Sequence, residues 1–330
     1  MKKILYLVYN RVDACSFYRA GGIIPDLNKK LGGQAEIYIM QWNEVEIHWQ
    51  FIIKFELVIM QRPFTQEALN VAEFVKGFKI PIWVDHDDFL LGIPDSNKFS
   101  QLYNPSVREN IKNIIRLADI VTVTTEELRV QLLEYNENIV VIPNAFNDFI
   151  FKARPILPPP RKIIAWRGTD THQEDLQGRK MPINRLMTGN KDWIFHYIGY
   201  NPWFLAQTSN AFAHPEMDII IYHQTLQKIN PAIMQVPLTD HVFNRCKSNI
   251  AFIEAAYAGA VCVAPEWEEW KKPGVVTYKA SDESYEKAFK PIMKGDLNLV
   301  QENNLSWNYV KSNLLLSKVN EKRIEIIKNL

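Results

Sequence analysis

One segment of the chain sets a single carboxylate in an apolar run. Within Lys247–Pro265, Glu254 is the sole acidic residue. The spacing predicts a helix capped by Ser248 or Asn249, a positive-φ end at Gly259 and then a buried parallel strand. A carboxylate at the carboxyl edge of such a sheet accepts hydrogen bonds from ribose hydroxyls. The segment therefore predicts a nucleotide site, and the alternative for Glu254 is a solvent-facing helix residue.

A cation follows another predicted strand. Arg167 comes directly after the apolar residues 163–166 and stands beside Gly168. An arginine at the end of a strand, next to a residue without a side chain, reaches a diphosphate. The alternative is an ion pair on the surface.

Three carboxylates and an imidazole follow the strand predicted at 80–84. They are Asp85, His86, Asp87 and Asp88. Clustered carboxylates suit a metal ion held by Asp85 and Asp87. A helix-capping turn and a ligand-contacting site are the other interpretations. A weaker signal is the segment after the first strand, where Tyr18 and Arg19 are candidate contacts of an acceptor or a phosphate.

The elements that would position these groups alternate along both halves of the chain. Strands are expected at 3–9, 35–41, 57–61, 80–84, 120–124 and 139–142, and at 163–166, 194–198, 218–222, 232–236, 261–264 and 275–278. Helical spacing is found at 65–78, at 106–117 and from about 318 to 330. Such alternation predicts parallel sheets with helices on both faces.

The chain divides at a proline-rich segment. Four prolines fall within residues 153–161, and proline interrupts both helices and central strands. This segment is predicted to link an N-terminal domain, residues 1–152, to a C-terminal domain, residues 162–310. Residues 311–330 are predicted to be a C-terminal helix that returns to the first domain.

Composition is that of an ordinary globular protein. The 330 residues carry a net charge of +1, which argues against a protein that works by bulk attraction to phosphate or membrane. The three cysteines, which show no zinc spacing, favour a reducing compartment, and a cytoplasmic location is expected. No apolar run is long enough for a membrane span, and the N-terminal apolar run is too short for a signal peptide.

The segment around Glu254 resembles the nucleotide-sugar site of the retaining glycosyltransferase family 4. The resemblance implies the GT-B fold, in which two Rossmann-like domains face each other across a cleft. It also implies that Glu254 contacts the donor ribose and that Arg167 neutralises the leaving diphosphate. The family often has an earlier glutamate where this chain has Cys246, and a lysine shortly after the arginine that is missing here. Lys247 and Ser248 are the candidates that serve the donor instead, with Gly168 beside them.

A second, local resemblance is to phage DNA α-glucosyltransferase. The His86–Asp87 step and the segment Ala118–Glu126 carry it. This likeness implies that His86 and Asp87 face the transferred sugar, with Asp85 and Asp88 as further contacts. It also raises a hydroxymethylated DNA base as the acceptor, in a phage-encoded protein.

Three functional hypotheses follow. The first is a retaining glycosyltransferase that needs no metal or other cofactor and uses a nucleotide sugar, with UDP-sugars favoured and a glycan or another hydroxyl compound as acceptor. The second is the same chemistry on a modified DNA base, and the third is a non-catalytic nucleotide-binding or scaffold protein on the same fold. A nicotinamide enzyme fits poorly, because no GxGxxG follows the first strand. The sugar, the acceptor and the oligomeric state stay open.

Overall fold

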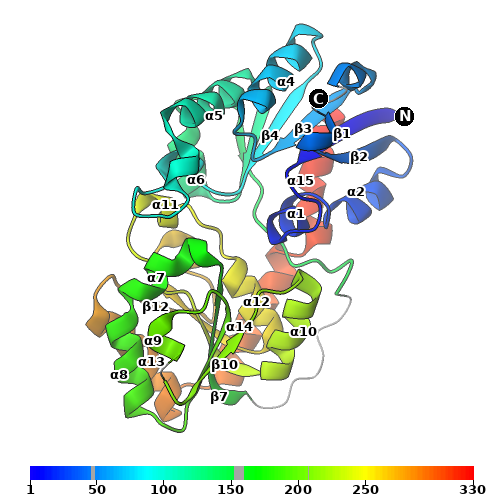
Figure 1. Cartoon of the computed structure of the whole chain (residues 1–330). Coiled ribbons are helices and arrows are strands. Elements are labelled where there is room, and N and C mark those ends of the chain that lie inside the picture. The colour runs from blue at the N-terminus through cyan, green and yellow to red at the C-terminus, as the bar shows by residue number, and fades with distance from the viewer. Residues whose placement is uncertain (46–48, 152–159, 207) are drawn as a thin grey trace. The chain divides into compact units, whose positions relative to one another are not determined.

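The computed structural model describes residues 1–45, 49–151, 160–206 and 208–330 (Figure 1). The chain forms two compact units. Unit 1 comprises Met1–Lys152, Cys246–Ser248 and Leu314–Leu330, and unit 2 comprises Ala153–Arg245 and Asn249–Asn313. Most of the predicted linker lies outside the described residues, and its last residue, Arg161, is the first residue of a strand.

Unit 1 contains a parallel sheet with six strands among its described residues. In sheet order they are β2 (Ala35–Gln41), β1 (Lys2–Val8), β3 (Leu57–Gln61), β4 (Ile82–His86), β5 (Ile120–Val123) and β6 (Ile139–Val141). The interior of the sheet is built from β-branched and leucine side chains that exclude water almost completely.

Helices cover both faces of this sheet. They are α1 (Ala14–Arg19), α2 (Ile24–Leu31), α3 (Trp42–Val45), α4 (Gln66–Gly77), α5 (Pro105–Leu117), α6 (Glu126–Leu132) and α15 (Leu316–Asn329). Local signals explain where they begin: Thr65 caps α4, and Asn104 caps α5, where Pro105 occupies the first turn.

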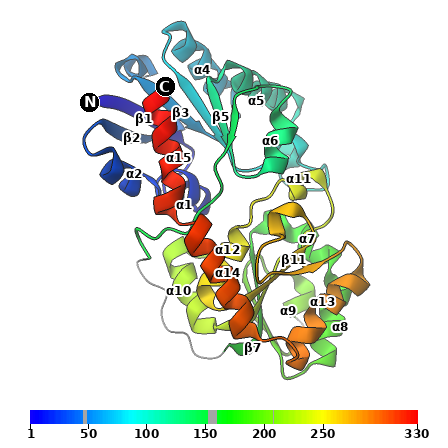
Figure 2. The same cartoon turned by 180° about the vertical axis from the view of Figure 1, so that it is seen from behind.

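The C-terminal helix α15 is part of unit 1. Its apolar side, from Leu316 to Ile327, joins the cluster formed by α2 and the sheet residues Ile4, Tyr6 and Ile37. Helix α15 lies beside α2 (Figure 2). This confirms the prediction that the C-terminal helix returns to the N-terminal domain. The predicted helix at 311–330 is, however, interrupted: α14 ends at Asn313, and Leu315 forms a bridge with Phe146 before α15 begins.

Unit 2 also has a parallel sheet with six described strands, in a different order. The order is β12 (Val276–Tyr278), β11 (Val261–Pro265), β10 (Pro231–Gln235), β7 (Arg161–Gly168), β8 (Ile194–Gly199) and β9 (Ala211–His214). The chain builds β7, β8 and β9 outward in one direction and then returns to add β10, β11 and β12 on the other side. The strand order therefore reverses between β7 and β10.

Two helical layers enclose this second sheet (Figure 1). One layer contains α10 (Ile219–Ile229), α12 (Ile250–Ala258) and α14 (Leu299–Asn313), and the other contains α7 (Gln173–Gly178), α8 (Lys180–Gly189), α9 (Trp203–Ala206) and α13 (Asp282–Lys294). A short helix, α11 (Val242–Arg245), follows β10. The predicted turn after α12 is confirmed, because Gly259 has a φ of 89°.

One strand prediction in unit 2 is wrong and one strand was missed. Residues 218–222, expected as a strand, begin helix α10, where the Asp218 side chain caps the amide of Ile220. Strand β9 lies at the edge of the sheet, and Phe212 is half exposed, so the local sequence lacks the apolar signal of a buried strand. The two parallel six-stranded sheets confirm the predicted α/β fold with two Rossmann-like domains.

Candidate functional site

The carboxyl ends of β7 and β10 mark the ligand-binding edge of unit 2. In open α/β sheets, ligands bind outside the carboxyl ends of the strands, at the point where the strand order reverses. Arg167 and Gly168 end β7, and Gln235 ends β10. Helix α12 covers the sheet beside these strands and carries Glu254.

Arg167 and Glu254 bond directly to each other. The Arg167 Nε donates to Glu254 Oε2 at 2.9 Å, and its Nη2 lies 3.4 Å from Oε1. Tyr222 of α10 donates its hydroxyl to the same Oε2 at 3.0 Å. Strand alternation explains the pairing, because Ile164 and Trp166 point into the α7–α8 side of the core and Arg167 therefore points toward α12.

The two members of this ion pair differ in exposure. The Glu254 side chain is 1% exposed, whereas the Arg167 side chain is 31% exposed. Burial and the Glu254 carboxylate raise the pKa of Tyr222 well above its usual range, so the phenol stays a hydrogen-bond donor. The buried Glu254 carboxylate fixes the position of the Arg167 guanidinium, and the exposed part of the guanidinium stays accessible to an anion.

Both sequence-based alternatives for these residues are wrong. Glu254 does not face solvent, because α12 is buried on nearly all sides. Arg167 does not form a surface ion pair, because its partner is buried. Tyr222 was missed as a site residue, since it was assigned to a strand, although its helical spacing with Leu226 and Ile229 was a usable signal.

The N-terminus of α12 is capped from outside the helix. Asn249 occupies the cap position, but its side chain makes no capping hydrogen bond. Instead the Asn249 amide donates to Glu269 Oε1 at 3.2 Å. Burial raises the pKa of Glu269 to about 7, against the opposing effect of Lys272. The predicted side-chain cap at Ser248 or Asn249 is therefore replaced by a carboxylate that is distant in sequence.

Lys247 and Ser248, which were expected to bind the donor together with Arg167, belong to unit 1. Unit 1 holds the segment Cys246–Ser248 through three side chains. Thr125 donates to the Cys246 carbonyl at 2.9 Å, Asn144 donates to the Ser248 hydroxyl at 2.8 Å, and Lys247 lies 3.7 Å from Asp88. The participation of Lys247 and Ser248 in donor binding stays a prediction.

Arg19 and Asp85 form a buried ion pair in unit 1. The Arg19 Nε donates to Asp85 Oδ2 at 3.0 Å, and Arg19 Nη1 donates to the Ile142 carbonyl at 2.6 Å. Thr122 donates to Asp85 Oδ1, and neither charged residue is more than 2% exposed. Burial favours a higher pKa for Asp85, but Arg19, Thr122 and Arg323 together outweigh burial, and the net shift of the pKa is downward. The pair therefore contributes to the stability of unit 1, and the acceptor contacts expected of both residues stay a prediction.

Asp87 and Asp88 share a different arginine. Arg62, whose φ of 49° lies in the left-handed region, donates through Nε to Asp87 and through Nη2 to Asp88. Burial and the two neighbouring aspartates raise the pKa of Asp87, while Arg62 opposes the rise. Tyr18, which the sequence suggested as a further acceptor or phosphate contact, lies buried in α1. Arg62 was not predicted as a site residue, because it is the single charged residue within 57–66 and its two partners lie 25 and 26 residues further along the chain.

His86 lies on the opposite face of β4 from Asp85, as strand alternation requires. It is 1% exposed, and no described residue provides a hydrogen-bond partner for its Nε2. Burial lowers the pKa of His86 to about 4, and Arg62 adds to the effect. His86 is therefore a neutral ring at neutral pH, and its expected contact with a transferred sugar stays a prediction.

Acid should destabilise the protein through His86. The unfolded chain binds a proton at about pH 6.5, whereas the folded chain does so only near pH 4, so stability is lost as the pH falls between these values. We expect His86 to account for about 2 kcal/mol of lost unfolding free energy between pH 7 and pH 5. Chemical denaturation of the wild type and of His86→Gln at both pH values measures this, and equal losses in the two proteins would contradict it.

No group of three or more histidine, cysteine, aspartate or glutamate side chains within the described ranges is placed to hold a metal ion. Asp85 and Asp87, the carboxylates considered for such a site, each bond to an arginine instead.

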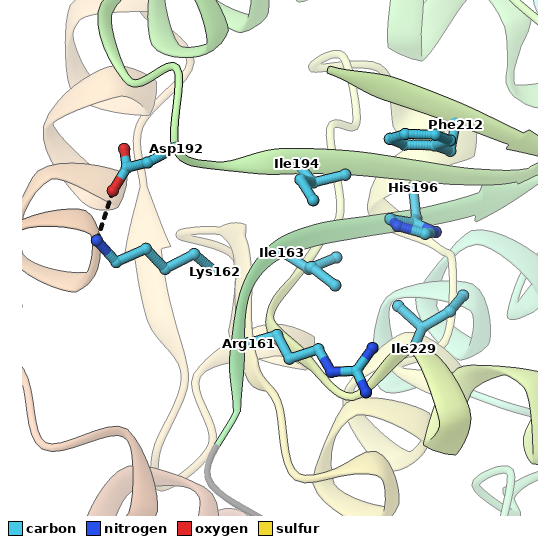
Figure 3. A pocket seen from close by; sticks show the side chains of 8 residues that line it. All are labelled: Arg161, Lys162, Ile163, Asp192, Ile194, His196, Phe212 and Ile229. Carbon is cyan, nitrogen blue, oxygen red and sulfur yellow. Dashed lines mark hydrogen bonds and ion pairs between the residues drawn. The ribbon is translucent and has the colours of Figure 1, made fainter.

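A separate cavity lies at the amino ends of β7 and β8, with a volume of about 310 Å³. Arg161, Ile194, His196 and Phe212 are among its lining residues (Figure 3). The His196 Nδ1 lies 2.8 Å from the His214 Nε2. This is the edge opposite the one at which parallel sheets bind ligands, so the cavity is not part of the Arg167 site.

No helix in the described part of the chain is both long and apolar enough to cross a membrane. No protein-family model matches the chain, and no curated protein matches it in sequence.

Solved structures do match the whole chain. S. aureus MnaA in a co-structure with UDP has a TM-score of 0.62 and 13% identity, covering 100% of this chain and 98% of that one. UDP-GlcNAc 2-epimerase from Neisseria meningitidis, bound to UDP-GlcNAc, has a TM-score of 0.59 and 12% identity, covering 99% and 100%. The UDP-forming α,α-trehalose-phosphate synthase of Burkholderia vietnamiensis has a TM-score of 0.66 and 11% identity, covering 100% and 99%. At these identities the chain is similar to these proteins in fold alone, as a two-unit α/β chain with a parallel six-stranded sheet in the described part of each unit.

Proposed function

We propose that this protein is a glycosyltransferase that uses a nucleotide sugar, with a UDP-sugar as the favoured donor. The observation that carries the proposal is the partly exposed Arg167, fixed by the buried Glu254 where the strand order of unit 2 reverses. The similarity in fold to proteins solved with UDP or UDP-GlcNAc supports the choice of nucleotide.

In this proposal the donor diphosphate binds at the carboxyl ends of β7 and β10. Arg167 neutralises the charge that develops on the leaving diphosphate, which is a large source of rate in such transfers. Gly168 tolerates no side chain, because a Cβ there would lie 2.6 Å from the Trp166 ring, so this strand end presents backbone alone to the phosphates. Glu254, whose carboxylate is buried and bonded to Arg167, orients the arginine, and its contact with the donor ribose stays a prediction.

The finer mechanism is that of a retaining transferase. The acceptor hydroxyl attacks from the face that the diphosphate leaves, and a phosphate oxygen takes the hydroxyl proton. No side chain is then required as a strong base. The resemblance around Glu254 supports this stereochemistry, and product analysis by NMR of the new anomeric centre tests it.

The first experiment is a donor screen. We expect UDP to bind with a Kd in the micromolar to millimolar range and one UDP-sugar to release UDP slowly even without an acceptor. Calorimetry measures the binding of UDP, and chromatography measures the release of UDP from the sugar donor. Failure to bind or turn over any nucleoside diphosphate or nucleotide sugar would contradict the proposal.

The same assay separates the competing functions. An epimerase would change the sugar while it stays on UDP, whereas a transferase releases UDP in proportion to the acceptor added. Hydroxymethylated DNA and short glycans serve as the two acceptor arms. A scaffold protein would bind the nucleotide without any turnover.

A further inference from the structure

A second polar group stands at the carboxyl end of β7. His172 closes the short helical turn Asp170–His172 that follows the strand, and its Nδ1 lies 3.1 Å from Asp175 Oδ2 on α7. An ionised carboxylate only accepts hydrogen bonds, so Nδ1 carries the proton and the opposite nitrogen, Nε2, points away from Asp175. The His172 side chain is 22% exposed.

Asp175 is itself fixed across the point where the strand order reverses. Its Oδ1 accepts from the Thr239 amide at 3.0 Å, from the Thr239 hydroxyl at 2.9 Å and from Asn244 Nδ2 at 2.6 Å. Thr239 lies between β10 and α11, and Asn244 lies on α11. One buried carboxylate thus joins the segment after β7 to the segment after β10, and it orients the His172 ring as it does so.

His172 also packs against the end of β7 itself. A Cβ on Gly168 would lie 3.1 Å from the His172 Cβ. The imidazole therefore stands beside the strand end that carries Arg167, and the buried Asp175 fixes its orientation.

We propose that His172 contacts the diphosphate of the nucleotide-sugar donor through Nε2 and is the second positive group beside Arg167. The inference rests on the proposed function and deepens it. In the complex the His172 ring is an imidazolium, because each of its two nitrogens then donates one N–H: Nδ1 to Asp175 and Nε2 to a phosphate oxygen.

Two substitutions separate this role from a structural one. His172→Asn places an amide nitrogen near the Nδ1 position, so it keeps the bond to Asp175 and removes Nε2. His172→Gln places its amide near the Nε2 position and loses the bond to Asp175. If the role of His172 is only to hold Asp175 in place, His172→Asn binds nucleoside diphosphates with the wild-type affinity.

The measurement is calorimetric binding of UDP, GDP and ADP, followed by the nucleoside of the tightest binder. We expect His172→Asn to melt at the wild-type temperature and to weaken nucleoside diphosphate binding roughly 10- to 100-fold, the loss of one charged hydrogen bond. Nucleoside binding should not change, because the nucleoside has no phosphates. His172→Gln should retain part of the diphosphate affinity and melt at a lower temperature.

His196→Asn is the matched control. It is the same substitution in the same unit, at a histidine whose Nδ1 also bonds to a neighbour but which lines the cavity at the amino ends of the strands (Figure 3). It should bind as wild type. Wild-type diphosphate affinity in His172→Asn would overturn the inference alone, whereas a wild-type protein that binds no nucleoside diphosphate would overturn the proposed function as well.

Discussion

Replacing Arg167 by glutamine is expected to lower the turnover of the nucleotide sugar by roughly 10²–10³-fold. The guanidinium is the positive group that unit 2 holds most firmly at the carboxyl end of β7, where Glu254 and Tyr222 fix its position. Glutamine keeps a polar side chain there but supplies no charge to the leaving diphosphate. Steady-state release of UDP, with the donor found in the screen, measures the effect.

A double variant keeps this test free of stability effects. Arg167→Gln alone leaves the buried Glu254 carboxylate without its cation and should cost about 3 kcal/mol of unfolding free energy. Arg167→Gln combined with Glu254→Gln removes both charges, so it should regain most of that stability and none of the activity. Activity that returned together with stability would show that Arg167 acts only in folding.

A matched control is available on the surface of unit 2. Arg185 and Glu286 form an ion pair in which the Arg185 side chain is 49% exposed. Glu286→Gln breaks this pair with the same change that Glu254→Gln makes in the site. It should leave turnover unchanged and alter stability by less than about 1 kcal/mol.

The order of elements was predictable because each one carries a local signal. Strands β2 and β3 begin and end at the predicted residues, since short β-branched runs bounded by polar residues have few alternatives. Helix α10 was predicted as a strand, because the three consecutive isoleucines Ile219, Ile220 and Ile221 are typical of one. The helix forms nevertheless, since Asp218 caps it and its buried side recurs with helical spacing.

The site was only partly predictable because its geometry depends on residues far apart in sequence. The strand-end position of Arg167 and the helix position of Glu254 followed from local patterns. That they bond to each other is a consequence of α12 packing on β10 and β11, next to β7 in the sheet, which no local pattern encodes. The same holds for Lys247, whose three-residue segment is held in unit 1 by Thr125, Asn144 and Asp88.

The Arg19–Asp85 pair shows that residues with the sequence signals of a ligand site can also stabilise the fold. A carboxylate at the end of a strand and an arginine after the first strand both suggest ligand contacts. In the structure the Arg19 guanidinium donates to Asp85, to the Ile142 carbonyl and, at 3.4 Å, to Asn144. A second buried arginine, Arg323 of α15, lies in the same electrostatic environment, and burial together with Arg19 lowers its pKa to about 10.

Asp85→Asn should therefore be among the most destabilising single substitutions in unit 1, with a loss of about 3–5 kcal/mol of unfolding free energy. Asparagine matches aspartate in shape, but it leaves Arg19 and Arg323 as two buried cations without the carboxylate that compensates them. Urea denaturation followed by circular dichroism measures the loss.

The control for this prediction is an exposed pair in the same unit. Arg129 lies 2.6 Å from Glu126, whose side chain is 64% exposed, so Glu126→Gln should cost less than about 1 kcal/mol. Arg19→Met combined with Asp85→Leu, which removes both charges, should be more stable than Asp85→Asn, because an unpaired buried charge costs more than the loss of the pair. An Asp85→Asn variant as stable as Glu126→Gln would instead mean that Asp85 is solvated, and the acceptor contact expected from its position in the sequence would then be the better interpretation.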